Sequence, residues 1–207
     1  MEKLDLTKKY KPYYSAKTKP ELIHVEEAYY LSIAGKGDPS GSLFAEKIQA
    51  LYSTAYAVKF TYKDEGKDFV VAKLEGLWWF DEEKYKGLTI TESSQKVPRS
   101  EWEYRLLIRM PEYVTEEQVR ECIAATHEKK PLKFLDEVEF YKMKEGQCIQ
   151  MLHVGPFANE PESLQKMQGL IEENAFKKNG LHHEIYLSDF RRTAPEKLKT
   201  ILREPVA

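Results

Sequence analysis

The sequence lacks most of the features that mark disulfide-bonded, zinc-binding or membrane-spanning chains. Only two of its 207 residues are cysteines, Cys122 and Cys148, and they form no C-x-x-C pair. This spacing argues against a metal site and against a disulfide framework. No apolar run approaches the ~20 residues of a membrane span, and the first residues, MEKLDLTKKYKPYY, contain no apolar core of a signal peptide. We therefore expect a cytoplasmic chain that does not contact a membrane and keeps both thiols reduced.

An excess of charge of one sign is also missing. The chain contains 32 Lys and Arg residues and 34 Asp and Glu residues, so its formal net charge is −2. Nucleic-acid-binding domains need a basic surface, and this balance argues against nucleic acid as a partner. The basic start, TKKYKPYY, with prolines at 12 and 20, favours an extended strap over the surface rather than a helix.

Motifs for several kinds of chemistry are absent as well. No serine or cysteine lies in a G-x-S-x-G setting, and GKGDPSG has neither the Walker lysine nor the spacing of a dinucleotide-binding loop. His182 and His183 are neighbours in a predicted strand, so their side chains diverge, and no third ligand has a useful spacing. We expect no metal and no cofactor.

The order of predicted elements repeats along the chain. Hydrophobic periodicity predicts a strand over 21–35, a helix over 42–63 and strands over 69–80 and 101–110. The same order returns as a strand over 147–155, a helix over 164–180 and strands over 181–190 and 197–206. Between them lies a predicted helix over 115–130 that opens with Thr115 and Gln118 at capping-box spacing.

This repetition predicts an internal duplication, with chance similarity as the competing explanation. An alignment of the halves without gaps places Glu75 opposite Glu184 and Arg109 opposite Arg203. The predicted fold is α+β: two β-α-β-β units in pseudo-two-fold tandem form one antiparallel sheet, and both helices lie on one face and flank a ligand groove. We expect a single domain over 1–207, with a strap over 1–20, a first repeat over 21–113, a connecting helix and strand over 114–145 and a second repeat over 146–207.

The segment HHEIYL places a glutamate in a strand that is otherwise apolar. A buried carboxylate is costly unless it is paired, protonated or kept for a ligand. Because side chains alternate between faces, Glu184 and Tyr186 point the same way. A structural pair with Tyr186, Arg191 or Arg192 would explain the carboxylate, and so would a role as a general base.

Aromatic residues make up 12% of the chain. They serve cores and ligand pockets alike. The adjacent Trp78 and Trp79 cannot both enter one layer. Either one packs in the core and the other under the N-terminal strap, or at least one lies in the groove as a stacking wall. We predict a groove lined by Trp79, Trp102, Tyr104, Phe157 and Tyr186.

Several segments together resemble the GyrI-like small-molecule-binding family, in particular its stand-alone members. They are GKGDPSG, ALYSTAYAVKF, LEGLWW, QMLHVGPF and, above all, HHEIYLSDFRRTAPEKLKTILREPV. The resemblance runs from about Pro20 to Val206 and implies the duplicated unit, an aromatic ligand groove and a glutamate at its floor that corresponds to Glu184. Phe190 departs from the pattern, because proline is expected there in many relatives.

The chain looks most similar to a subgroup described as cyclopropanoid cyclohydrolases. That resemblance implies water addition to, and ring opening of, cyclopropane-bearing DNA-alkylating xenobiotics such as yatakemycin-type compounds, which would protect the cell and confer drug resistance. The expected catalytic residues are Glu184, with Tyr186 or Tyr141 as hydrogen-bond donor. The residues expected to bind the planar aromatic substrate are Glu75, Trp78, Trp79, Trp102, Tyr104 and Phe157.

Two other functions fit the same residues. The groove would bind or sequester planar, often cationic, small molecules without turnover, or it would accept a protein or peptide partner such as gyrase. For each function we expect a monomer or a weak homodimer.

Overall fold

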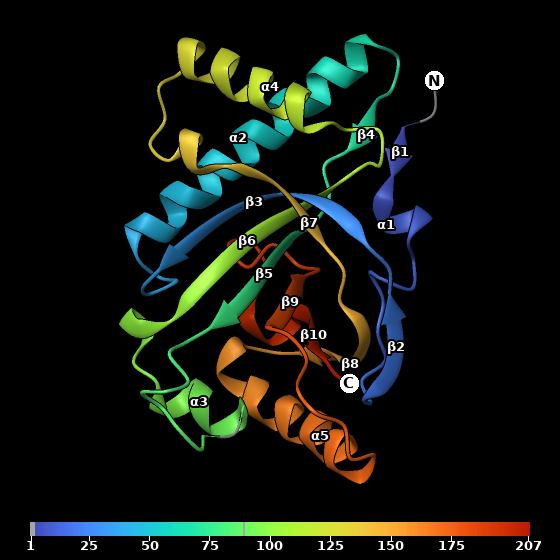
Figure 1. The fold of residues 1–207 in the computed structure, drawn as a ribbon, viewed down its shortest axis with the longest axis vertical. Coiled ribbons are helices and arrows are strands. Elements are labelled where there is room, and N and C mark those ends of the chain that lie inside the picture. Colours follow the sequence, from blue (N-terminus) through green and yellow to red (C-terminus); the bar gives the residue numbers. More distant parts are fainter. Residues whose placement is uncertain (1–2, 89) are drawn as a thin grey trace.

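Across residues 3–88 and 90–207, which the computed structural model describes, one antiparallel sheet of eight strands runs through the molecule (Figure 1). A smaller parallel sheet pairs β1 (Leu4–Asp5) with β4 (Phe69–Val70). The large sheet consists, in spatial order, of β2 (Glu21–Val25), β8 (Gly146–Val154), β10 (Lys199–Pro205), β9 (His182–Tyr186), β5 (Leu74–Trp79), β6 (Glu103–Met110), β3 (Ala28–Lys36) and β7 (Glu139–Met143).

The predicted duplication is confirmed by this strand order. The first unit is β3, α2 (Ser42–Asp64), β5 and β6, and the second is β8, α5 (Glu160–Glu173), β9 and β10. In each unit the third strand lies between the first and the second, and the two units meet where β5 pairs with β9. The antiparallel pairing of these equivalent strands gives the pseudo-two-fold arrangement.

Both helices of the duplicated units lie on the same face of the sheet, as predicted. The ladder places one row of residues side by side on that face: Leu106, Gly76, Glu184, Leu202 and Met151. From α2, Phe44 packs against Tyr104, whereas Leu164 and Met167 of α5 pack in a cluster with Met151 and Leu202. In the view of Figure 1, α2 lies toward the top of the molecule and α5 at the bottom.

The register corrects the alignment of the two glutamates. Gly76 lies opposite Glu184, and Glu75 lies opposite Ile185. Residues that pair across a ladder share a face, so Glu75 and Glu184 point to opposite faces of the sheet. The ungapped alignment was wrong by one residue in this strand, and a slip of one residue exchanges the faces.

The other helices complete the two ends of the molecule. α4 (Glu116–Lys129) packs beside α2, and its N-terminus is capped as predicted by Thr115, whose Oγ1 accepts a hydrogen bond from the Gln118 amide at 3.3 Å. α3 (Ile90–Lys96), which lies between the predicted strands over 69–80 and 101–110, packs beside α5. Four single-turn helices are η1 (Arg99–Glu101), η2 (Leu135–Glu137), η3 (Phe157–Asn159) and η4 (Pro195–Lys197).

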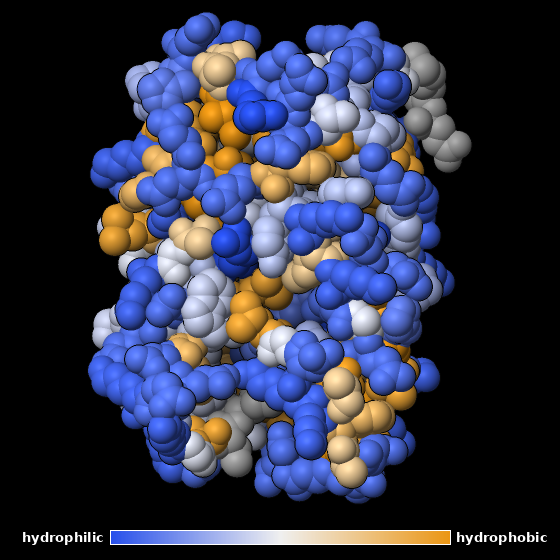
Figure 2. Space-filling model, in the orientation of Figure 1, coloured by the Kyte–Doolittle hydropathy of each residue, from blue (hydrophilic) through white to orange (hydrophobic). Residues whose placement is uncertain are grey.

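The N-terminal strap contains a short helix that the sequence did not predict. α1 (Leu6–Lys9) begins after Asp5, whose side chain accepts a hydrogen bond from the Thr7 amide at 3.0 Å. This cap supplies a partner for an otherwise orphaned amide and explains why a Lys-rich segment turns here. None of the described helices combines the length and hydrophobicity needed to cross a bilayer. On the face shown in Figure 2, hydrophilic residues predominate, and hydrophobic ones gather in smaller groups between them.

A buried polar network fastens the strap to the sheet face that carries no helix of the duplicated units. Glu75 Oε2 accepts a hydrogen bond from the Tyr13 hydroxyl at 2.5 Å and lies 3.0 Å from His183 Nε2. His183 Nδ1 lies 2.9 Å from Glu145, and Arg203 donates to Glu145 at 3.1 Å. Burial disfavours the charge of Glu145, but His183 and Arg203 outweigh it and lower its pKa to about 2. Each charge therefore has a partner, as buried charges require.

The other aligned pair, Arg109 and Arg203, does share a face of the sheet. Arg109 and Arg203 both lie on the strap face, and both guanidinium groups stack on the Tyr13 ring, 4.6 and 4.4 Å from its centroid. The alignment of the last strands is therefore consistent with the register, and the equivalent arginines hold one tyrosine of the strap between them.

Candidate functional site

A groove of about 920 Å³ hollows the helix-bearing face of the sheet. It lies between the start of α2, the first turn of α5 and the segment that leads from β5 to β6. This volume is in the range of small-molecule sites. Its aromatic lining comprises Phe44, Trp78, Trp79, Phe80, Tyr85, Trp102, Phe157, Tyr186 and Phe190.

A chain of hydrogen bonds forms the floor of the groove. The Trp78 indole donates to the Tyr186 hydroxyl at 3.0 Å, and this hydroxyl donates to Glu184 Oε2 at 2.6 Å. A Cβ at position 76 would lie 2.9 Å from Trp78 Nε1 and 3.1 Å from the Tyr186 oxygen, so glycine leaves the space in which the two rings meet. Burial and the charge of Glu184 raise the pKa of Tyr186 well above its usual value. Tyr186 therefore keeps its proton and holds Glu184 in place.

His182 links Glu184 to a second carboxylate. Its Nε2 lies 3.3 Å from Glu184 Oε1, and its Nδ1 contacts Glu204 Oε1. Burial opposes protonation of the imidazole, but Glu204 and Glu184 raise the pKa of His182 to about 10. The imidazolium can donate from both ring nitrogens, one to each glutamate. The side chain of Glu184 remains 13% exposed, so it is reachable from the groove.

Glu160, in the first turn of α5, adds a third carboxyl group to the groove wall. Burial and then the charge of Glu184 raise the pKa of Glu160 well above its usual value. Glu160 therefore holds its proton more tightly than a solvent-exposed glutamate does, beside a Glu184 that accepts a hydrogen bond from Tyr186 and pairs with His182. Glu160 Oε1 and Glu204 Oε2 are buried and have no hydrogen-bond partner among the described residues. No group of three or more His, Cys, Asp or Glu side chains in the described part of the chain is arranged to hold a metal ion.

Most of the predicted site residues line the groove. Trp102 packs edge-on against Phe80, with ring centroids 5.2 Å apart, and Phe157 packs edge-on against Tyr186 at 6.1 Å. Trp79 lines the groove as well, although it also packs with the hydrophobic cluster on the opposite face. The predicted residues that the structure brings together are Trp78, Trp79, Trp102, Phe157, Glu184 and Tyr186.

Three predicted residues do not line the groove. Tyr104 is 1% exposed and packs behind Trp78, with ring centroids 5.6 Å apart. Tyr141 lies on the opposite face of the sheet, where Arg105 stacks on its ring at 4.6 Å. Glu75 belongs to the network under the strap and is fully buried. The expectations that Tyr104 and Glu75 contact the substrate and that Tyr141 donates to it were therefore wrong for the groove described here, because burial or strand alternation removes each of them from it.

The arginines that follow β9 do not pair with Glu184. Arg191 donates to Asp189 at 3.1 Å, and Arg192 lies 3.8 Å from the same carboxylate. Of the structural pairs considered for Glu184, the structure therefore contains the pair with Tyr186 and not a pair with Arg191 or Arg192. Glu184 has Tyr186 and the unpredicted His182 as partners.

Sequence reasoning missed His182, Glu160 and Glu204. His182 shares the face of Glu184 by simple alternation, which was a usable signal for a charged pair. Glu204 is two residues from Leu202, which lies opposite Glu184, so its place follows only from the strand register. Glu160 comes from a turn whose approach to β9 depends on tertiary packing, and no local pattern indicates it.

Comparisons with known proteins agree with the fold and the groove. Residues 18–207 match the model of the GyrI-like small molecule binding domain. An uncharacterized conserved protein from Listeria innocua has 37% sequence identity to the chain and a TM-score of 0.88, with 99% of this chain and 100% of that chain covered. A hydrolase from Listeria innocua has 37% identity and a TM-score of 0.85, with 99% and 100% coverage. A second structure of a Listeria innocua hydrolase has 36% identity, a TM-score of 0.87 and full coverage of both chains, 100% and 100%.

A search of curated proteins found no match. The family model nevertheless spans nearly the whole chain, and the Listeria structures share its fold at more than a third of positions identical. The chain therefore belongs to the GyrI-like small-molecule-binding family.

Proposed function

We propose that this protein is a hydrolase that adds water to a planar aromatic small molecule held in the groove, and that its substrates are cyclopropane-bearing DNA-alkylating compounds of the yatakemycin type. The observation that carries the proposal is the position of Glu184: a partly exposed carboxylate at the floor of an aromatic groove, fixed by Tyr186 and His182. The two Listeria structures described as hydrolases support the general class of reaction.

The aromatic walls supply the affinity for a flat ligand. Trp78 is held between Phe44, at a centroid distance of 6.0 Å, and Tyr104, at 5.6 Å, so its ring is rigid before the ligand arrives. Trp102 is fixed by its own hydrogen bond from the indole to the Val97 carbonyl at 3.3 Å. Preorganised rings lose little entropy on binding, which favours stacking on a planar molecule.

In the proposed reaction, Glu184 takes a proton from a water molecule while the water oxygen bonds to a cyclopropane carbon. The ring C–C bond breaks, and its electron pair moves through the conjugated system to the dienone oxygen, which becomes a phenolate. Glu160, whose pKa is raised by burial and by the charge of Glu184, donates its proton to that oxygen. A carboxyl group with a raised pKa can act as a general acid beside a carboxylate that acts as a general base. This assignment replaces Tyr186 as the donor, since its hydroxyl proton is directed at Glu184.

The experiment is to incubate the purified protein with a spirocyclopropane alkylator in ¹⁸O-labelled water and to analyse the product by mass spectrometry. The proposal predicts a product heavier by one water molecule, with the label in the new hydroxyl group, formed far faster than in buffer alone. Product formation at the rate of the buffer control for every cyclopropanoid tried would show the proposal to be wrong.

A second candidate function is binding of planar cations without turnover. It is favoured by the charges at the floor, where Glu184 and Glu204 face the single imidazolium of His182. In that case a planar cation would quench tryptophan fluorescence on titration and be recovered unchanged. Substitution Trp102→Ala should weaken either kind of ligand by roughly 1–3 kcal/mol, so the product, not the affinity, distinguishes the two functions.

A further inference from the structure

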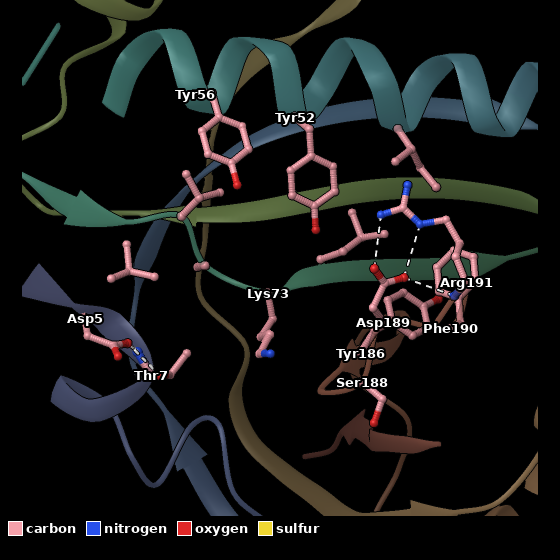
Figure 3. Close-up of a pocket in the computed structure, with 15 residues that line it drawn as sticks. Asp5, Thr7, Tyr52, Tyr56, Lys73, Tyr186, Ser188, Asp189, Phe190 and Arg191 are labelled. Carbon is pink, nitrogen blue, oxygen red and sulfur yellow. Dashed lines mark hydrogen bonds and ion pairs between the residues drawn. The ribbon is translucent and has the colours of Figure 1, made fainter. Parts of the chain in front are cut away.

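A second cavity, of about 390 Å³, lies under α2 and borders on Tyr186 and Phe190, which also line the groove (Figure 3). Its walls come from four separate parts of the chain: α2, the segment 70–74 that leads into β5, the start of α1 and the loop after β9. Nothing in the proposed reaction uses this cavity. It is large enough for a small single-ring or two-ring ligand.

The cavity is rich in hydrogen-bond donors that have no partner of their own. The hydroxyl groups of Tyr52 and Tyr56 point from α2 into it (Figure 3), and neither makes a hydrogen bond within the described part of the chain. Ser188 Oγ accepts from the Lys199 amide at 3.1 Å, which leaves its own proton free to donate. Burial raises the pKa of Tyr52, so its phenol stays a donor.

The charges around the cavity leave one cation unmatched. Arg191 is 3.1 Å from Asp189, and Asp5 is 4.0 Å from the ammonium of Lys8. Lys73, an exposed residue at the rim, also lines the cavity, and no carboxylate of the described residues lies within 4.0 Å of its ammonium group. A bound anion would therefore find an ammonium group that is not already neutralised.

Apart from Thr7, whose hydroxyl donates to Asp5, the remaining lining is apolar. Ile48, Val70, Val71 and Leu74 contribute aliphatic surface, and the Phe190 ring closes one side. This lining favours a flat hydrophobic body, whereas the phenols and Lys73 favour an acceptor of negative charge at one end. The groove has the opposite character, with carboxyl groups at its floor.

We propose that this cavity is a second binding site, separate from the groove, for a small aromatic carboxylate. The ring of the ligand packs against the aliphatic wall and Phe190, and the carboxylate accepts hydrogen bonds from Lys73 and Tyr52. The proposal rests on the residues of this cavity and does not depend on whether the groove catalyses ring opening.

The test is calorimetric titration of the full-length protein with 2-naphthoate, and with 2-naphthylmethanol as a neutral analogue of the same shape. The carboxylate should bind about 10-fold more tightly than the alcohol, because only the carboxylate forms a charge-assisted bond with Lys73. Lys73→Gln should weaken 2-naphthoate binding about 10-fold, and Tyr52→Phe about 3-fold. Lys63→Gln, which changes an exposed lysine of α2 that lines neither cavity, should have no effect.

Three results would each overturn the proposal. They are equal affinity for the two ligands, an unchanged affinity in Lys73→Gln, and no binding of 2-naphthoate at millimolar concentration. A further variant, Trp102→Ala, identifies the cavity that is occupied: if it weakens 2-naphthoate binding while Lys73→Gln does not, the ligand binds in the groove and the second site is wrong.

Discussion

At the scale of single residues, His182 determines the charge of the groove floor. It is buried between Glu184 and Glu204, and their negative charges keep it protonated against the cost of burial. A neutral imidazole has a single N–H, so one of the two carboxylates would lose its donor and both would lose the neutralising positive charge, which is unfavourable in a site of low dielectric constant. The imidazolium thus allows Glu184 to remain available to a ligand.

We predict that His182 stays protonated well above neutral pH. Its pKa is about 10 in the folded chain, against about 6.5 in an unfolded one. Nitrogen-15 NMR of the imidazole should show the imidazolium form at pH 8. A transition near pH 6.5 would contradict the assignment of the ion pairs.

The same pKa shift predicts how stability depends on pH. Because the pKa is higher in the folded state, the contribution of His182 is complete below about pH 6.5 and is lost as the pH rises through about 10. The free energy of unfolding should therefore decrease between pH 7 and 10, and the decrease should be smaller in His182→Asn. The matched control is His24→Asn, since His24 is an exposed residue of β2, and it should leave the decrease unchanged.

At the scale of elements, the central strands β5 and β9 carry ligand-site residues on one face and structural residues on the other. β5 and β9 present Trp78, Glu184 and Tyr186 to the groove, and they present Glu75 and His183 to the strap. The buried network on the strap face is paired within the protein, whereas Glu160 Oε1 and Glu204 Oε2 at the groove have no partner among the described residues. This difference separates a structural network from a ligand site.

We predict that the buried Tyr13 contributes strongly to holding the strap. Tyr13→Phe removes the shorter of the two hydrogen bonds that strap tyrosines donate to buried Glu75, the other coming from Tyr14, and should cost about 1–3 kcal/mol of the free energy of unfolding, measured by urea denaturation. Tyr10→Phe is the matched control: it removes the same group from the same strap, but its partner Glu112 is exposed, so the loss should be about 0.5 kcal/mol or less. Equal losses in the two variants would show that the buried network does not fasten the strap.

The sequence predicted the elements better than it predicted the site. Hydrophobic periodicity identifies strands and helices locally, and the repeated order of elements was enough for the duplicated sheet. Alternation along one strand also predicted which side chains share a face, as for Glu184 and Tyr186. The register between distant strands could not be predicted from the sequence, because it depends on loop lengths. An error of one residue in this register placed Glu75 on the wrong face. Glu160 and Glu204 approach Glu184 only through tertiary packing, so no local signal indicates them.

At the scale of the whole molecule, the two faces of the sheet have separate roles, one in the groove and one in the stability of the fold. One face carries α2, α5 and the groove, and the other is closed by the strap over a fully paired network. The central claim is therefore that Glu184 serves a ligand and Glu75 serves the fold, although the two glutamates lie on adjacent strands only one ladder position apart.

The most direct test compares Glu184→Gln with Glu75→Gln, which make the same chemical change on opposite faces of the sheet. For each variant, the rate of cyclopropane opening by the folded protein and the free energy of unfolding are measured. Glu184→Gln should lower the rate by on the order of a hundredfold, because a positioned base is lost, and should change stability little. Glu75→Gln should reduce stability by about 1–3 kcal/mol and leave the rate within a few-fold. An undiminished rate in Glu184→Gln, or a rate that falls equally in both variants, would contradict this division of tasks.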